Sequence, residues 1–383
     1  MATMERLNDW FSNGVLARLA SGLLAPVAGI DPSAAAPLPP LISLAGTPAE
    51  IGAAEGTACP SQIAPLLRVM GTGASLLQLP RPRRTAALVT AIPAEHHAEL
   101  AAVAEASGCQ VERILRANVL VDSCCSVLVA PAVSGGSAAC PLRLVRNMDF
   151  FPADVIGPST VVKRYRPVGR LAFVSIGWPG YAAVVSGMNA AGVVACVLLQ
   201  HGSGIRPTGM PVCFRLRTIL EHATDLESAI AAFAAPPAVA SGHYALLADA
   251  HSAAVVWQGT GQVIRHDPTS GWLAASNGPR RNRLPDDPRG RWLLRQIAAL
   301  GGAVPDAAWL RQVATAVGQR STTAQSMVWE PATKTLELAT GSARRPAAWE
   351  TWRRYRLSDW LEGGDAPKAE DLGRPEPLPH FLG

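Results

Sequence analysis

Charged side chains are scarce in this sequence. Asp, Glu, Lys and Arg together make up 16% of the 383 residues, whereas 49% of the residues are hydrophobic. This balance excludes an intrinsically disordered chain and predicts a sizeable apolar core. The net charge is only +5, from 34 Lys and Arg against 29 Asp and Glu. Because a charge of +5 spread over 383 residues gives only a weak positive electrostatic potential, we expect no nucleic acid partner.

Long apolar runs are also missing. A membrane-spanning helix needs about 20 consecutive apolar residues, and the apolar stretch at residues 14–30 is interrupted by Arg18 and Pro26. That stretch also lacks the basic start of a secretory signal. Residues 4–24 have helical periodicity, which predicts a helix packed on the body of the protein. We therefore expect no stable membrane insertion.

Cysteine is uncommon and follows no pattern. The chain has seven cysteines, and an odd number at irregular spacings does not indicate a disulfide framework. No pair has the spacing of zinc ligands with histidines behind it. We therefore expect a cytoplasmic protein, kept in a reducing compartment, with neither a metal nor a cofactor.

Strand and helix patterns alternate in blocks rather than as a regular βαβ series. A Pro- and Ala-rich linker at residues 31–40 precedes a short strand, and Thr47 to Glu50 has the residues of a capped helix start. Such blocks predict an α+β fold of antiparallel sheets covered by helices. Further strands are expected at 159–165, 171–176, 181–187, 192–199, 243–249, 253–258, 271–275, 325–330 and 335–339, and further helices at 91–119, 211–223, 225–233, 291–300 and 305–317.

The segment from residue 119 to residue 150 predicts a β-hairpin, because two apolar, β-branched runs flank a Gly-Gly pair. If Gly135-Gly136 forms a two-residue turn, Cys124 lies opposite Asn147. Arg146 and Asp149 then lie within a residue or two of the thiol. The hairpin would gather a thiol, a guanidinium and a carboxylate at one end of a two-stranded ribbon.

A thiol needs a base, since its reference pKa is about 8.5, and no histidine is near Cys124 in the sequence. The α-amino group of Cys124 could serve if the Ser123–Cys124 bond were cut, which the thiol can do by attacking the Ser123 carbonyl. Asp149 would then orient the amine, and Arg146 would favour the thiolate. The alternative is a purely structural pair of cysteines beside a surface ion pair.

These residues resemble a known group of enzymes. Cys124-Cys125-Ser126-Val127, followed by Arg146-Asn147-Met148-Asp149-Phe150, is similar to the start of the catalytic chain in acid ceramidase and N-acylethanolamine acid amidase. Asp122-Ser123-Cys124 resembles the cleavage point of the isopenicillin N acyltransferases. Similar motifs follow the same order at 46–52, 187–192, 206–211, 275–277 and 285–289.

The resemblance implies a cysteine N-terminal-nucleophile hydrolase with a four-layer αββα sandwich. Residues 1–40 would be an N-terminal helix and linker, 41–123 the helical propeptide or small chain, and 124–383 the catalytic chain. Cys125 stands where the family has Thr or Ser and is a competing nucleophile. The implied catalytic residues are Cys124, Arg146, Asp149, the oxyanion donor Asn277 and Arg289; the cleavage site is Ser123 and Cys124, and the implied substrate contacts are Asn147, Met188 and Asn189.

The implied function is that of a self-cleaving zymogen acting on the amide C–N bonds of N-acyl amines or N-acyl amino acids. A Cys124 acyl-thioester would be the intermediate, and no cofactor would be needed. The partner would be a small N-acyl substrate, with acyl-CoA as a candidate acyl donor, and the two chains would stay associated. The alternatives are an uncleaved, inactive binding protein of the same fold, and a conventional Cys–His enzyme using His201 or His243.

Overall fold

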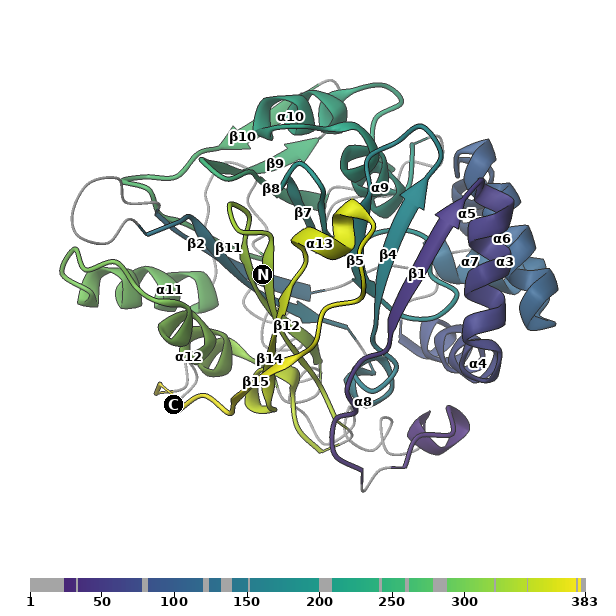
Figure 1. Cartoon of the computed structure of the whole chain (residues 1–383), viewed down its shortest axis with the longest axis horizontal. Coiled ribbons are helices and arrows are strands. Elements are labelled where there is room, and N and C mark those ends of the chain that lie inside the picture. Colours follow the sequence, from purple (N-terminus) through teal and green to yellow (C-terminus); the bar gives the residue numbers. More distant parts are fainter. Residues whose placement is uncertain are drawn as a thin grey trace.

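The computed structural model describes residues 24–31, 34–77, 82–119, 124–131, 140–150, 152–199, 209–240, 243–258, 262–277, 288–319, 322–342, 344–376 and 378–379. Its strands form two sheets (Figure 1). In the described residues the first sheet runs, in spatial order, β1 (Leu41–Gly46), β4 (Val161–Pro167), β5 (Phe173–Gly177), β6 (Ser186–Asn189), β7 (Val194–Leu199), β8 (His243–Ala248), β9 (Ala253–Gln258) and β10 (Val263–His266). The second runs β11 (Leu273–Ser276), β2 (Cys124–Ala130), β3 (Arg143–Asp149), β12 (Thr323–Glu330), β13 (Thr335–Thr340), β14 (Trp352–Arg356) and β15 (Glu370–Gly373).

Helices cover the outer face of each sheet. On the first sheet, α9 (Val212–His222) packs on β6 and β7, and α10 (Leu226–Ala234) packs on β8 and β9. On the second, α11 (Pro288–Ala299) packs on β11 and β2, and α12 (Ala307–Val317) packs on β3 and β12 (Figure 1). Strands β2 and β7 meet between the sheets. The expected α+β sandwich of four layers is confirmed.

A group of helices lies beside β1 and belongs to the N-terminal segment, which we define as residues 41–119 (Figure 1). This segment adds β1 to the first sheet as a parallel neighbour of β4. Its helices are α3 (Pro48–Ala58), α4 (Pro60–Leu77), α5 (Pro82–Thr90), α6 (Ala94–Ser107) and α7 (Val111–Val119). Three further short helices in the described part of the chain are α8 (Ala153–Ile156), the 3₁₀-helix η1 (Ala347–Trp349) and α13 (Ser358–Glu362).

Two glycines let α3 and α6 approach closely. A Cβ atom on Gly52 would lie 2.0 Å from the backbone oxygen of Glu99, and one on Gly56 would lie 2.7 Å from the Cβ of Ala106. Only a residue without a side chain fits at either point. The Gly-x-x-x-Gly spacing of α3 therefore sets the distance between the two helices, and Glu55 and Glu99 project from this pair onto β4 and α9.

Most expected elements are present. Thr47 caps α3 in a complete capping box with Glu50, and the helices expected within 91–119 are α6 and α7. The strand expected at 181–187 is wrong, because the chain becomes a strand only at Ser186. Strands β10, β14 and β15 were not predicted. Most of the expected helix at 4–24 lies outside the described residues, and the described helices include none that is long and apolar enough to cross a membrane.

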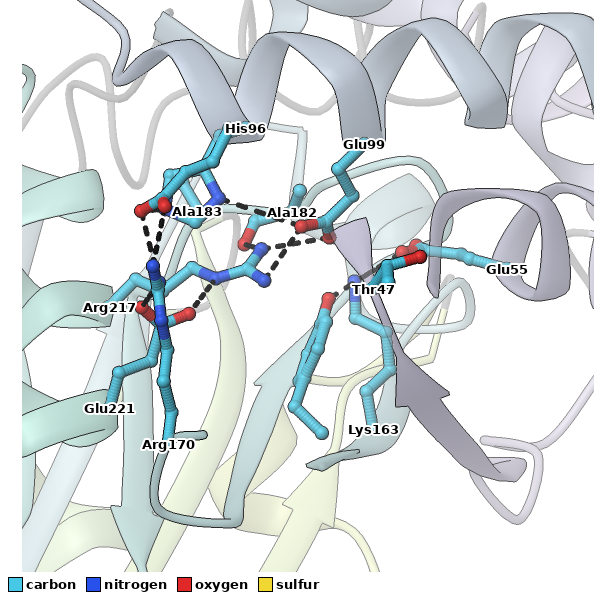
Figure 2. A network of polar contacts seen from close by, with 12 residues as sticks. Thr47, Glu55, His96, Glu99, Lys163, Arg170, Ala182, Ala183, Arg217 and Glu221 are labelled. Carbon is cyan, nitrogen blue, oxygen red and sulfur yellow. Dashed lines mark hydrogen bonds and ion pairs between the residues drawn. The ribbon is translucent and has the colours of Figure 1, made fainter. Parts of the chain in front are cut away.

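Buried charges join the N-terminal segment to the rest of the protein (Figure 2). Glu55 on α3 and Lys163 on β4 are both fully buried and form an ion pair of 3.0 Å. Glu99 on α6 pairs with Arg217 on α9 at 2.7 Å, and both side chains are at least 98% buried. Arg217 also binds Glu221 at 2.9 Å. A buried cation is tolerated only with such partners, so the body of the fold depends on the carboxylates of this segment.

Lys163→Met should lower the free energy of unfolding by about 3–5 kcal/mol, because it leaves the buried Glu55 carboxylate without its cation. The measurement is urea denaturation. Lys334→Met is the matched control, since Lys334 is paired with the exposed Glu362 at 3.6 Å and such pairs contribute about 0–1 kcal/mol. Equal losses in the two variants would contradict the importance assigned to the buried pair.

The same network should make the fold sensitive to acid. The hydrogen bond from Arg170 lowers the pKa of Glu95. Burial alone would raise the pKa of Glu99, but Arg217 and His96 more than offset it and lower that pKa. Burial, and then the Arg217 charge, lower the pKa of His96. For all three groups the pKa is lower in the folded protein than in the unfolded chain. As the pH falls, the unfolded chain therefore takes up protons before the folded protein does, and the free energy of unfolding decreases.

The free energy of unfolding should therefore fall as the pH drops below the ordinary histidine value of about 6.5, and fall further as the two carboxylates titrate. His96→Leu should flatten the part of this slope between about pH 7 and pH 5. Urea denaturation over a pH series measures it, with His222→Leu, at an exposed position, as the control. A His96→Leu slope equal to that of the unmodified protein would rule out the histidine contribution.

Candidate active site

The register of β2 and β3 places Cys124 directly opposite Asp149. Ser126 lies opposite Asn147, and Val127 lies opposite Arg146. The expected pairing of Cys124 with Asn147 is therefore wrong by two residues, because it assumed a two-residue turn at Gly135-Gly136. Those two glycines lie outside the described residues. A shift of two residues keeps every side chain on its face of the sheet. In the observed register, Asp149 takes the place opposite Cys124 that was expected for Asn147.

Four strand ends meet at this edge of the second sheet. Since β11, β2, β3 and β12 are neighbours and alternate in direction, β2 and β12 begin where β3 and β11 end. Cys124 begins β2 and Asp149 ends β3. Asn277 directly follows β11, one residue beyond the pair formed by Ser276 and Ser126. The antiparallel sheet thus gathers the predicted nucleophile, carboxylate and oxyanion donor.

Asp149 is held by two donors. Its buried carboxylate accepts a hydrogen bond from the Thr323 hydroxyl at 2.5 Å and one from the Arg289 guanidinium at 2.8 Å. Arg289 sits in the first turn of α11, where the helix dipole disfavours a cation. The ion pair with Asp149 offsets this cost, and it places Arg289 next to another of the expected site residues.

Thr323 was not predicted from the sequence, where it precedes an expected strand without any motif. A β-bulge between Thr323 and Gln325 inserts an extra residue into β12. As a result Thr323 lies opposite Asp149 and Ser326 lies opposite Asn147. On a regular strand, residues three apart face opposite sides of the sheet, but the bulge puts Thr323 and Ser326 on the same side. The Thr323 hydroxyl accepts from the Gln319 N–H at 2.7 Å, which leaves its proton for Asp149.

Arg146 lies three residues before Asp149 and therefore on the opposite face of β3. It is 1% exposed and extends toward the first sheet. There it donates to the Val185 carbonyl, to the Ser186 hydroxyl, and to the Val197 carbonyl at 2.8 Å. These three acceptors are neutral, and they hold the guanidinium between the sheets, close to the strand that begins with Cys124.

The three expected substrate contacts have different surroundings. The Asn147 amide donates to the Ala314 carbonyl of α12 at 2.8 Å and accepts from Ser326 at 2.7 Å. Met188 is fully buried in the core of the first sheet. The Asn189 side chain makes four hydrogen bonds, two to carbonyls at the end of α9 and two from N–H groups of its own turn. These contacts argue against direct substrate binding by Met188 or Asn189 and give them structural roles.

Metal-ligand geometry occurs at one place in the described residues. Ligand atoms of Glu95, His96 and Glu221 lie within 4.8 Å of one another. However, the Arg170 guanidinium already donates to both carboxylates, and Arg217 pairs with Glu221. Two guanidinium groups supply the positive charge that a metal would bring, so this cluster is part of the ion network.

Residues 137–280 match the model of the acyl-coenzyme A:6-aminopenicillanic acid acyl-transferase family. This segment includes Arg146, Asp149 and Asn277, and it excludes Cys124 and Arg289. The resemblance seen in the sequence is thus confirmed over that segment. No curated protein sequence matches the chain.

Solved structures give three further likenesses. An N-acylethanolamine-hydrolyzing acid amidase ortholog of Caenorhabditis elegans is 18% identical, with a TM-score of 0.45, covering 54% of this chain and 92% of its own. A mutant conjugated bile acid hydrolase of Clostridium perfringens is 12% identical, with a TM-score of 0.42, covering 67% and 99%. Penicillin V acylase of Agrobacterium tumefaciens is 15% identical, with a TM-score of 0.39, covering 66% and 100%.

Arg289→Ala should destabilise the protein by about 3–5 kcal/mol, because it removes the cation from a buried carboxylate. Arg295→Ala, on an exposed position of the same helix, should change the stability by less than about 0.5 kcal/mol. Urea denaturation measures both variants. If Arg289→Ala were as stable as Arg295→Ala, the ion pair with Asp149 would not be holding the N-terminus of α11 on the sheet.

Proposed function

We propose that the chain is a self-cleaving cysteine enzyme that hydrolyses amide C–N bonds or transfers their acyl groups, with Cys124 as its N-terminal nucleophile. The observation that carries this proposal is the pairing of Cys124 with Asp149 at the sheet edge where β11 delivers Asn277. The match of residues 137–280 to an acyltransferase family supports the same chemistry.

Maturation cuts the Ser123–Cys124 peptide bond. The Cys124 thiol attacks the Ser123 carbonyl, a C–S bond forms as the C–N bond breaks, and the nitrogen takes up a proton to become an amine. Water then hydrolyses the thioester, which leaves a carboxylate on Ser123 and restores the thiol. The new α-amino group has a reference pKa of about 8, so it can accept the proton of its own thiol near neutral pH.

The two faces of β3 support a division of tasks around Cys124. On one face Asp149, aligned by Thr323 and Arg289, stabilises the ammonium form of the amine. On the other face Arg146, a permanent cation, favours the thiolate. Asn277 donates its amide to the oxyanion of the tetrahedral intermediate, a contribution of about 3–4 kcal/mol in related chemistry.

In turnover the thiolate attacks the acyl carbon of the substrate. The ammonium returns its proton to the leaving amine as the C–N bond breaks, and an acyl-thioester on Cys124 remains. Water resolves it in hydrolysis, and a second amine resolves it in acyl transfer. The substrate is a small N-acyl amine or N-acyl amino acid, and acyl-CoA is the candidate donor because of the family match. The buried ion pairs and β1 support continued association of the two chains.

The register also favours Cys124 over its neighbour. Cys124 pairs with Asp149, whereas Cys125 pairs with Met148, which is fully buried in the core. A nucleophile at Cys125 would start the strand opposite a methionine and would leave Asp149 without an amine to orient. Cys124 therefore has the better surroundings for both the cleavage and the catalytic cycle.

The mature protein should contain two pieces, residues 1–123 and 124–383, measured by intact mass and by N-terminal sequencing of the larger piece. Cys124→Ala should remain one chain and should lose amidase activity by several orders of magnitude, because the nucleophile is absent. Activity is followed as amine release from a panel of N-acyl amines and N-acyl amino acids, and as acyl transfer from acyl-CoA.

Cys125→Ser is the matched control, and it should be cut and active. An uncut chain with full activity would contradict the mechanism. An uncut chain without activity or enhanced thiol reactivity would favour the alternative, a binding protein that keeps the fold without the chemistry. Cleavage that survives Cys124→Ala but not Cys125→Ser would transfer the role to Cys125.

A further inference from the structure

The connection between β5 and β6, residues 178–185, is buried without forming a strand. Trp178, Tyr181 and Val185 are at most 1% exposed. Buried N–H and C=O groups need hydrogen-bond partners, and a strand would find them in a neighbouring strand. This loop finds many of them in side chains from other parts of the protein.

Two of these side chains come from the N-terminal segment. The Glu55 carboxylate accepts from the Gly180 N–H at 2.8 Å. The Asn118 amide, 1% exposed, donates to the Gly180 carbonyl and accepts from the Ala182 N–H, each at 2.8 Å. It also accepts from the Ala183 N–H at 3.3 Å. Asn118 thus holds the middle of the loop through both the nitrogen and the oxygen of its side-chain amide.

Two cations from the body of the protein hold the same loop. Lys163 donates to the Tyr181 carbonyl and to the Trp178 carbonyl, the latter at 3.3 Å. Arg217 donates to the Ala182 carbonyl at 2.7 Å, and Figure 2 shows it pointing to Glu99 on α6. One counter-ion of each cation, Glu55 for Lys163 and Glu99 for Arg217, again belongs to the N-terminal segment. The path of the loop therefore depends on the N-terminal segment in two ways. Glu55 and Asn118 bond the loop directly, and Glu55 and Glu99 balance the charges of the two cations that bond it.

The loop ends at the acceptors of Arg146. The Val185 carbonyl and the Ser186 hydroxyl, which come shortly after the part held by Asn118, accept from the Arg146 guanidinium. The Val185 carbonyl also accepts from the Val197 N–H at 3.0 Å, which joins it to β7. A change in the loop would move two of the groups that fix the direction of this guanidinium.

We propose that the N-terminal segment is a positioning element of the active site, in which Asn118 acts through residues 178–185 to hold the Arg146 guanidinium between the sheets, where its positive charge acts on β2, the strand that Cys124 begins. This inference rests on the proposed role of Arg146 at the Cys124 thiol. It gives the small chain a task after cleavage, because the thiol would keep its activated state only while Asn118 holds the loop.

The test is the pH dependence of Cys124 alkylation by iodoacetamide, followed by peptide mass in the full chain with Cys125→Ser as the background. Asn118→Ala should raise the midpoint of the pH–rate profile toward the value of an ordinary thiol, about 8.5. The rate near neutral pH should fall by up to roughly tenfold for each unit of that rise. Arg146→Met should raise the midpoint at least as far.

Gln258→Ala is the matched control. Gln258 is a buried amide that also bonds backbone groups, donating to Ala234 and accepting from Val239 at 2.9 Å each, but it holds a different loop. It should lose stability as Asn118→Ala does and leave the midpoint unchanged. If Asn118→Ala does not fold, Asn118→Asp keeps the acceptor, loses the donor to Gly180, and should give a smaller rise.

The outcomes separate the two proposals. A midpoint that rises in Arg146→Met but stays unchanged in the folded Asn118 variants would overturn the positioning role and leave the proposed function intact. A midpoint that stays unchanged in Arg146→Met would remove Arg146 from the chemistry, whatever the Asn118 variants do. A rise in Gln258→Ala equal to that in Asn118→Ala would show a general loss of packing and would also overturn the inference.

Discussion

The structure depends on burying two cations, Lys163 and Arg217, under helices that come from a different part of the chain. Glu55 balances the charge of Lys163, and Glu99 balances that of Arg217 together with Glu221. The constraint is mutual, because these carboxylates are equally buried. It explains why α3 and α6 meet at glycines: the helices must come close enough together to project one carboxylate onto β4 and the other onto α9. The N-terminal segment is in this sense part of the fold and not an appendage to it.

The candidate active site results from the antiparallel order of the second sheet. Residues that are far apart in the sequence, Cys124, Asp149, Asn277 and Thr323, come together because their strands alternate in direction and share one edge. The bulge in β12 then turns one hydroxyl onto the carboxylate, and α11 adds a cation from its first turn. Asp149 is thereby fixed in direction before any substrate arrives, which is the condition for electrostatic preorganisation. The positive charge of Arg146 lies on the other face of β3, held by the first sheet.

The differences from the sequence-based expectations have a common physical cause. Residues 181–187 have the β-branched and aromatic composition of a strand, yet residues 178–185 form a loop because Asn118, Glu55, Lys163 and Arg217 satisfy its backbone. Asn189 belongs to a recognisable motif, but its amide is used within its own turn and by α9. In both cases some of the hydrogen-bond partners are distant in sequence, side chains for the loop and α9 carbonyls for Asn189, and no window of neighbouring residues contains that information.

The sequence by itself determined the α+β class and most strands and helices, and it suggested the residues expected around Cys124, since periodicity, capping residues and short motifs are local properties. Only the tertiary structure decided the register that sets Cys124 against Asp149, the recruitment of Thr323, the ion pair of Arg289 with Asp149, and the connection from Asn118 to Arg146. Register depends on the length and geometry of a connection, and recruitment depends on which strand ends and helix starts share an edge. Both are long-range consequences of packing, and buried charge makes them specific, because a misplaced partner would leave an ion without a counter-charge.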